Sequence, residues 1–161
     1  MAKGKTDKAA NMSPRIANRR ATHDYHISDK LEVGIELRGT EVKSIRNGQV
    51  SLAEGFARVE PGTEELILYN VEISQYPHAG EHQHEPKRAR KLLAHKRQIL
   101  ELMDKTSAKG ATIIPLAMYF LRGRVKLEIG VGTGKQHQDK RQDIKKRDAD
   151  REIRRAMSKR R

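Results

Sequence analysis

Five side chains that could together bind a divalent metal lie in one short segment: His78, Glu81, His82, His84 and Glu85. Imidazole and carboxylate groups are common ligands of Zn²⁺, and a bound metal ion activates water for hydrolysis. The segment between Pro77 and Pro86 is polar, however, and predicts a flexible loop without a fixed ligand geometry. We expect these side chains to be solvated, and a metal-dependent nuclease or hydrolase is kept only as an alternative function.

The segment GVGTGK, residues 130–135, looks like part of a phosphate-binding loop. That motif needs a glycine five residues before Gly134, where this chain has Ile129, and a hydroxyl after the lysine, where it has Gln136. The sequence has no nucleophile elbow, no paired-histidine zinc helix and no cysteine. These patterns predict a protein that is not an enzyme and holds no metal or cofactor.

Basic side chains are concentrated at the two ends of the chain. The 161 residues carry a net charge of +13, of which residues 1–20 contribute +5 and residues 134–161 contribute +7. Residues 21–133 are nearly neutral at +1, although Lys87 to Arg97 holds six basic groups and no acid. A neutral body with basic patches is typical of nucleic-acid binding, because phosphates attract Lys and Arg whatever the base sequence.

A membrane partner is not expected. No apolar run approaches the roughly 18–20 residues of a membrane span, and the N-terminus lacks the hydrophobic region of a signal peptide. Neither basic arm has the broad apolar face of an interfacial helix. We therefore expect a soluble, cytoplasmic protein that binds RNA.

The last 28 residues contain 12 basic and 5 acidic side chains, and their large apolar side chains are Ile144, Ile153 and Met157. So little apolar surface cannot offset the entropy of ordering, so this tail is expected to be mobile when free. On a helix, Ala149, Ile153, Ala156 and Met157 share a narrow face, which predicts a helix that forms on a polyanion. A merely solubilising tail remains an alternative.

Alternating apolar residues predict strands along the body of the chain, most clearly from Leu31 to Leu37. The predicted strands are residues 25–37, 56–59, 66–73, 112–121 and 125–131. The turn at Pro61-Gly62 joins the second and third of them into a hairpin, and Pro115 indicates an edge or a bulge.

Two helices are predicted between these strands. A short one is expected from a cap at Thr40 through Arg46, closed by Asn47-Gly48. A longer one is expected over Arg88–Lys105, because its apolar residues recur at helical intervals. Short strands with one helix between the early and late ones favour a small closed barrel.

The predicted fold class is mainly β: an OB-like antiparallel barrel of about six strands, with one longer helix and one or two short helices. The predicted domains are a disordered basic arm at 1–15, the RNA-binding barrel at 16–133 and the basic tail at 134–161. With six aromatic residues in the chain, a base-stacking platform is not expected, so RNA would be recognised by its shape and backbone.

Five motifs, in this order, resemble those of the SsrA-binding protein family, also called small protein B. They are NRRATHDY at 18–25, GTEVKSIRNG at 39–48, RARKLLAHKRQI at 88–99, VKLEIGVGTGK at 125–135 and DKR at 139–141. The resemblance extends from Ile16 to the C-terminus. Any one motif is weak, but five in order make the resemblance specific.

The resemblance implies a partner, transfer-messenger RNA, and a role in trans-translation, the rescue of bacterial ribosomes stalled on messages without a stop codon. In this family the barrel binds the tRNA-like domain, and the tail enters the decoding centre and the empty message channel. Elongation factor Tu belongs to the delivered complex. A general ribosomal RNA-binding protein is a weaker alternative.

The resemblance assigns RNA binding to Asn18, Glu41 and Leu93. Charge and motif neighbourhood add His23 and a set of basic side chains: Arg19, Arg20, Lys43, Arg46, Arg88, Arg90, Lys91, Lys126 and Lys135. Two of these assignments have plainer alternatives, since Glu41 could instead orient Lys43 or Arg46, and Leu93 could be a core residue.

The resemblance also assigns decoding-centre contacts to the tail triplet Asp139, Lys140 and Arg141, and a message-channel contact to Met157. Gln138 stands where the family commonly has Tyr or His, and His137 is the expected substitute. The family's Gly-Lys-Lys is Gly134, Lys135 and Gln136 in this chain.

Overall fold

The computed structural model describes residues 14–158, except for the side chains of His137 and Gln138. The strands are β1 Ile16–Ala17, β2 Tyr25–Ile35, β3 Val50–Ser51, β4 Phe56–Glu60, β5 Glu65–Tyr69, β6 Glu72–Ile73, β7 Arg90–Leu93, β8 Ala111–Leu121 and β9 Arg124–Gly134. The helices are α1 Arg19–Asp24, α2 Gly39–Arg46, α3 Lys96–Thr106 and α4 His137–Ser158. Most of the predicted N-terminal arm lies outside the described residues.

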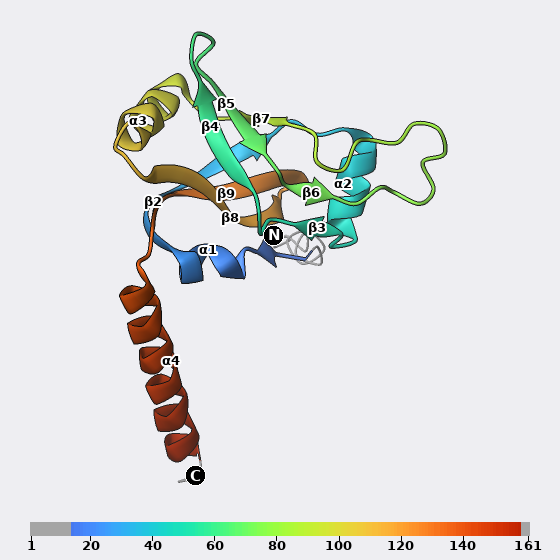
Figure 1. The fold of residues 1–161 in the computed structure, drawn as a ribbon. Helices are drawn as coiled ribbons and strands as arrows, with labels where there is room; N and C mark the ends of the chain where they lie inside the picture. The colour runs from blue at the N-terminus through green and yellow to red at the C-terminus, as the bar shows by residue number, and fades with distance from the viewer. Residues whose placement is uncertain (1–13, 159–161) are drawn as a thin grey trace, which may run out of the picture.

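Six antiparallel strands close into a barrel (Figure 1), which confirms the predicted fold class. The strands follow the order β8-β4-β5-β7-β2-β9, and pairing of β8 with β9 closes the ring. Strand β1 adds to β8, and β3 pairs with β6 in a separate small sheet. Closure leaves few unpaired backbone groups at strand edges.

The barrel core is built from the inward residues of each alternating strand. Val33 and Ile35 of β2 and Leu127 and Ile129 of β9 belong to one buried cluster, as the alternation predicts. Pro115 lies at a register shift in β8, which confirms the expected irregularity.

Two glycines of the GVGTGK segment, Gly130 and Gly132, allow close packing around β9. A Cβ on Gly130 would lie 2.7 Å from Ile27 Cγ2 and 3.0 Å from Leu116 Cδ1. A Cβ on Gly132 would lie 2.6 Å from Ile114 Cδ1. The segment is therefore a strand whose neighbours leave no room for a side chain at Gly130 or Gly132, and it is not a phosphate-binding loop.

The predicted helix over Arg88–Lys105 is wrong at its N-terminal end. Residues Arg90–Leu93 form strand β7, which pairs with β2 and β5, and α3 begins only at Lys96. The predicted strand over 66–73 is also interrupted, because Asn70 adopts a left-handed φ of 56° between β5 and β6. Helix α2 ends at Arg46 as predicted, but its cap is Arg38 instead of Thr40.

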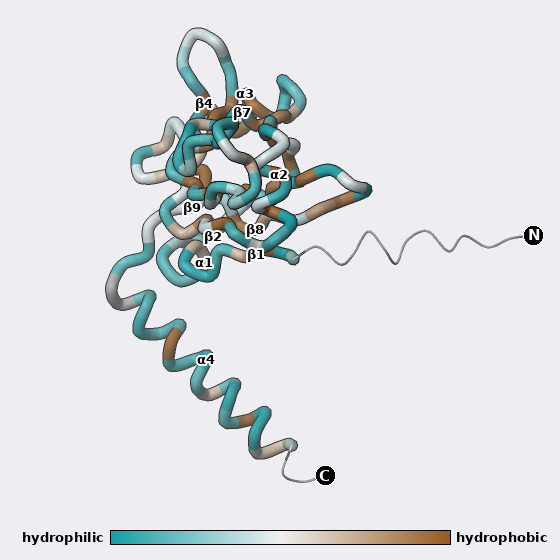
Figure 2. The backbone as a smooth tube through the Cα atoms, turned by 90° about the vertical axis from the view of Figure 1, so that its right-hand side faces the viewer, coloured by the Kyte–Doolittle hydropathy of each residue, from teal (hydrophilic) through white to brown (hydrophobic). Residues whose placement is uncertain are grey.

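Helix α4 extends away from the barrel below α1 (Figure 1). Its tube is hydrophilic along most of its length (Figure 2), and Ile144, Ile153 and Met157 are exposed. The sequence predicts this helix only on binding, whereas the structure describes it in the chain alone. Within residues 14–158, no helix is both long and apolar enough to cross a membrane.

Candidate nucleic-acid interface

A buried ion cluster joins α2 to the chain around β7. The Glu41 carboxylate accepts hydrogen bonds from Arg88 Nε at 2.9 Å, from Arg90 Nε at 2.8 Å and from the Arg38 backbone N–H at 2.7 Å. Burial raises the pKa of Glu41, but these hydrogen bonds outweigh it and hold the pKa below its usual value of 4.5. Glu41 is fully enclosed, which favours a structural role, and its predicted RNA contact stays a prediction. Its side-chain partners, Arg88 and Arg90, lie outside α2, contrary to the alternative that it orients Lys43 or Arg46.

Arg90 is also enclosed, with 1% of its surface exposed. Besides Glu41, its guanidinium donates to the backbone oxygens of Val71 at 2.7 Å, Pro86 at 2.9 Å and Arg88 at 3.0 Å. These contacts favour a structural role for Arg90, and its predicted phosphate contact stays a prediction. Arg88 is partly exposed but already shares Glu41 through two hydrogen bonds.

Asn18 caps α1 and has 7% of its surface exposed. Its Oδ1 accepts from the Ala21 N–H at 3.2 Å, and its Nδ2 donates to Leu52 O at 3.0 Å and to Pro115 O at 2.9 Å. These bonds use both N–H donors of the side-chain amide and one of the two acceptor positions on its oxygen. In the structure Asn18 thus fixes α1 on the barrel, and its predicted RNA contact stays a prediction.

Other predicted phosphate contacts do lie at the surface. They are Arg19 and Arg20 on α1, Lys43 and Arg46 on α2, and Lys91 on β7. The cations of α2 lie over aromatic rings, Lys43 over Tyr76 and Arg46 over Phe120. Whether these side chains contact RNA stays a prediction.

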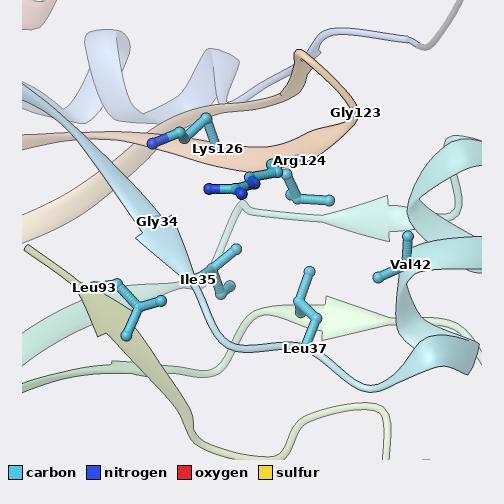
Figure 3. Close-up of a pocket in the computed structure, with 9 residues that line it drawn as sticks. Gly34, Ile35, Leu37, Val42, Leu93, Gly123, Arg124 and Lys126 are labelled. Atoms are coloured by element: carbon cyan, nitrogen blue, oxygen red, sulfur yellow. The ribbon is translucent and has the colours of Figure 1, made fainter.

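A surface of apolar and basic side chains lies where β7 ends beside the β8–β9 turn. Leu93, Arg124 and Lys126 line one open hollow of about 370 Å³ (Figure 3), and an adjoining hollow shares Arg124 and Lys126 and adds Leu121 and Arg122. We call these five residues the hairpin-end surface. Leu93 is 53% exposed and Leu121 is 43% exposed, so Leu93 is not a core residue.

Glu32 adds one acidic group to the edge of the hairpin-end surface. Its carboxylate accepts a hydrogen bond from the Tyr119 hydroxyl and lies 3.9 Å from Lys126 Nζ. The hydrogen bond to Glu32, with burial, raises the pKa of Tyr119 to about 12, so the phenol stays a neutral donor. Among residues 14–158, Arg122 and Arg124 pair with no acid, which leaves their charge available to a phosphate.

The loop over 78–85 does not assemble a metal site. Within the described residues, no three His, Asp or Glu side chains lie close enough together to coordinate one metal ion. His84 is buried, with Nδ1 2.9 Å from Thr40 Oγ1 and Nε2 3.0 Å from Ile73 O. Both ring nitrogens therefore tie the loop to α2 and β6.

The base of the tail contacts the barrel through its predicted functional residues. Lys140 Nζ lies 3.0 Å from Asp24 Oδ1, which also pairs with His23 at 2.9 Å, and Asp139 Oδ2 lies 3.4 Å from His26 Nε2. Arg141 and Met157 are exposed, and the His137 side chain lies outside the described part. The Lys135 side chain is largely buried, which favours a structural role over its predicted RNA contact.

A family model described as SmpB protein matches residues 15–159. The chain belongs to the SmpB family. The SsrA-binding protein of Carboxydothermus hydrogenoformans is 54% identical over 140 residues, covering 87% of this chain and 93% of that protein. The SsrA-binding protein of Thermobifida fusca is 47% identical over 159 residues, covering 99% and 98% of the two chains.

A solved structure described as "tmRNA-SmpB: a journey to the center of the bacterial ribosome" contains a similar chain. The TM-score is 0.66 at 42% identity, and the alignment covers 82% of this chain and 95% of that one. Both sequence and fold therefore place this chain among SmpB proteins.

In this SmpB-family chain, some of the predicted RNA-binding residues are buried and hold elements of the fold together, and the others are exposed. Sequence reasoning found Leu93 and Lys126 of the hairpin-end surface but missed its other three residues, Leu121, Arg122 and Arg124, and the neighbouring Glu32. The signal available for the two arginines was a turn, Arg122-Gly123-Arg124, between two long strands. A basic turn that joins alternating strands lies at one end of a barrel, where a ligand can reach it.

Proposed function

We propose that this SmpB-family chain is a non-enzymatic RNA-binding adaptor in trans-translation. It binds the tRNA-like domain of transfer-messenger RNA and delivers that RNA to stalled ribosomes. Its relatives carry the name SsrA-binding protein, and the structural neighbour is described with tmRNA and the ribosome. Elongation factor Tu is a further proposed partner, and the cytoplasm is the proposed location.

The hairpin-end surface is the observation that supports RNA binding most strongly. Three cations and two exposed leucines lie together at one end of a closed barrel. Cations attract the phosphates of any folded RNA, while the leucines suit unstacked bases or sugars at a loop. We therefore assign the tRNA-like domain to this end of the molecule.

We assign a separate task to the tail. Barrel residues 16–133 hold the RNA, and residues 134–161 follow the message channel as a helix when bound to the ribosome. Arg141 and the later cations of α4 face solvent, as contacts to ribosomal phosphates require. Asp139 and Lys140 must leave their partners on the barrel before they reach the decoding centre.

The two tasks are separable by mutation. Arg124→Ala should weaken binding of transfer-messenger RNA and reduce the slope of log affinity against log salt by about one unit. Changing Asp139, Lys140 and Arg141 to Ala should leave that affinity nearly intact and abolish peptide tagging on stalled ribosomes. Arg97→Ala, which removes an exposed cation on α3, is the matched control. Normal tagging by the triple variant would refute the tail assignment, and an unchanged salt slope for Arg124→Ala would refute the barrel assignment.

A further inference from the structure

Lys135 lies at the junction between β9 and α4 and is largely enclosed. Its side chain is 8% exposed, and its Nζ donates to Thr22 O at 2.9 Å and to the Asp143 carboxylate. Its backbone N–H donates to Asp24 O at 2.8 Å. Lys135 thus donates hydrogen bonds to two carbonyl groups at the end of α1, where carbonyls lack partners within the helix. It also donates to an acid in the second turn of α4.

The enclosure of Lys135 differs from that of every other paired lysine in the described residues. The remaining lysines in ion pairs keep at least 30% of their side-chain surface exposed. Fixing a lysine costs side-chain entropy, so an enclosed lysine persists where several acceptors hold it. Lys135 has two acceptors, and they belong to different elements.

Two more contacts tie the first turns of α4 to the same corner of the barrel. Lys140 pairs with Asp24, and Asp139 lies near His26. Hydrogen bonds from His23 and Lys140 lower the pKa of Asp24 below its usual value, so its carboxylate stays charged in this joint. These contacts engage residues of the DKR triplet, whereas Lys135 and Asp143 lie outside it.

We propose that Lys135 and Asp143 are positioning residues that set the direction in which α4 leaves the barrel. The proposal rests on the proposed function, since it concerns how one tail reaches the ribosome while the barrel holds RNA. Helix α4 has 22 residues and is about 33 Å long, so a rotation of about 10° at its base moves its far end by about 6 Å. Such a shift exceeds the reach of a hydrogen bond, so the joint determines which phosphates the tail meets.

The direction of α4 can be measured in the free protein. The chain has no cysteine, so Lys109→Cys and Glu152→Cys introduce two spin labels, one on an exposed barrel turn and one on exposed α4 surface. Lys135→Met and Asp143→Asn should each broaden the distance distribution between the labels, while Lys135→Arg should restore a narrow one. Asp148→Asn is the matched control, because within residues 14–158 Asp148 pairs only with Arg151 inside α4. Equal widths in all variants would overturn the proposal and leave the proposed function untouched.

A functional measurement separates positioning from direct RNA contact. Asp143→Asn and Lys135→Met should keep their affinity for transfer-messenger RNA within about twofold and lower the tagging rate roughly tenfold, as misplacement does. Asp148→Asn should tag normally. Broadened distances with normal tagging would overturn the proposal, and so would loss of RNA affinity in Lys135→Met with unchanged distances. If the unmodified chain itself failed to support tagging, the proposed function would be wrong. The distance distributions would still test whether Lys135 and Asp143 fix the direction of α4.

Discussion

Glu41 accepts four hydrogen bonds from three residues in a place that water does not reach. An isolated buried carboxylate would be costly, and so would Arg90 without its partner. Together they connect α2 to β7, which carries Leu93 to the barrel end. We therefore expect Glu41, which the family resemblance associates with RNA, to act through the fold that presents the proposed RNA surface.

Glu41→Gln tests this role through stability. The amide cannot neutralise two arginines, and breaking a buried ion pair costs about 3–5 kcal/mol. We expect the midpoint of urea unfolding to fall sharply, with RNA affinity recovering under conditions that restore the fold. Glu65→Gln, which breaks the exposed pair with Lys91, should change the midpoint far less. An unchanged midpoint combined with lost RNA binding would instead make Glu41 a direct contact.

Acid should destabilise the barrel through the same carboxylate. The folded-state pKa of Glu41 is below the usual 4.5, so folding is favoured while the group is ionised in both states. This contribution is complete above pH 4.5 and is lost as the pH falls through the lower, folded-state pKa. Unfolding free energies measured between pH 7 and pH 3 should decline more for the unmodified chain than for Glu41→Gln. Parallel curves would show that another acid dominates.

At the scale of elements, strands with strict alternation could be predicted from sequence, and β7 could not. Leu92 and Leu93 are adjacent and follow the two cations Arg90 and Lys91, a pattern that suits a helix as well as a strand. Pairing with β2 and β5 makes this segment a strand, in which Leu92 faces the core and Leu93 faces solvent. Similarly, charge alone could not distinguish the buried Arg90 from the exposed Lys91, because the partner Glu41 lies 49 residues away.

Strand β9 offers a test within one glycine segment. Gly130→Ala places a methyl group 2.7 Å from Ile27 Cγ2, and overpacking of this kind typically costs about 1–3 kcal/mol. Gly134→Ala has no atom within 4 Å of the new Cβ and serves as the matched control. Chemical denaturation should show a lower midpoint for Gly130→Ala alone. Equal stability of the two variants would mean that the barrel relaxes around β9.

At the scale of the whole molecule, the body and the tail are stabilised by different means. The barrel is closed by backbone pairing around a buried apolar cluster, whereas α4 meets it through polar contacts at its base. Removing residues 137–161 should therefore leave the urea midpoint and the affinity for the isolated tRNA-like domain nearly unchanged, while tagging on stalled ribosomes is lost. A second variant separates the charge of the tail from its apolar side chains. Replacing Ile144, Ile153 and Met157 with Ala keeps the tail charge and tests whether apolar contacts in the message channel are needed for tagging. A truncated chain that unfolds at a much lower urea concentration would show that the tail is part of the folded body. The proposal that the barrel binds RNA while the tail separately contacts the ribosome would then be wrong.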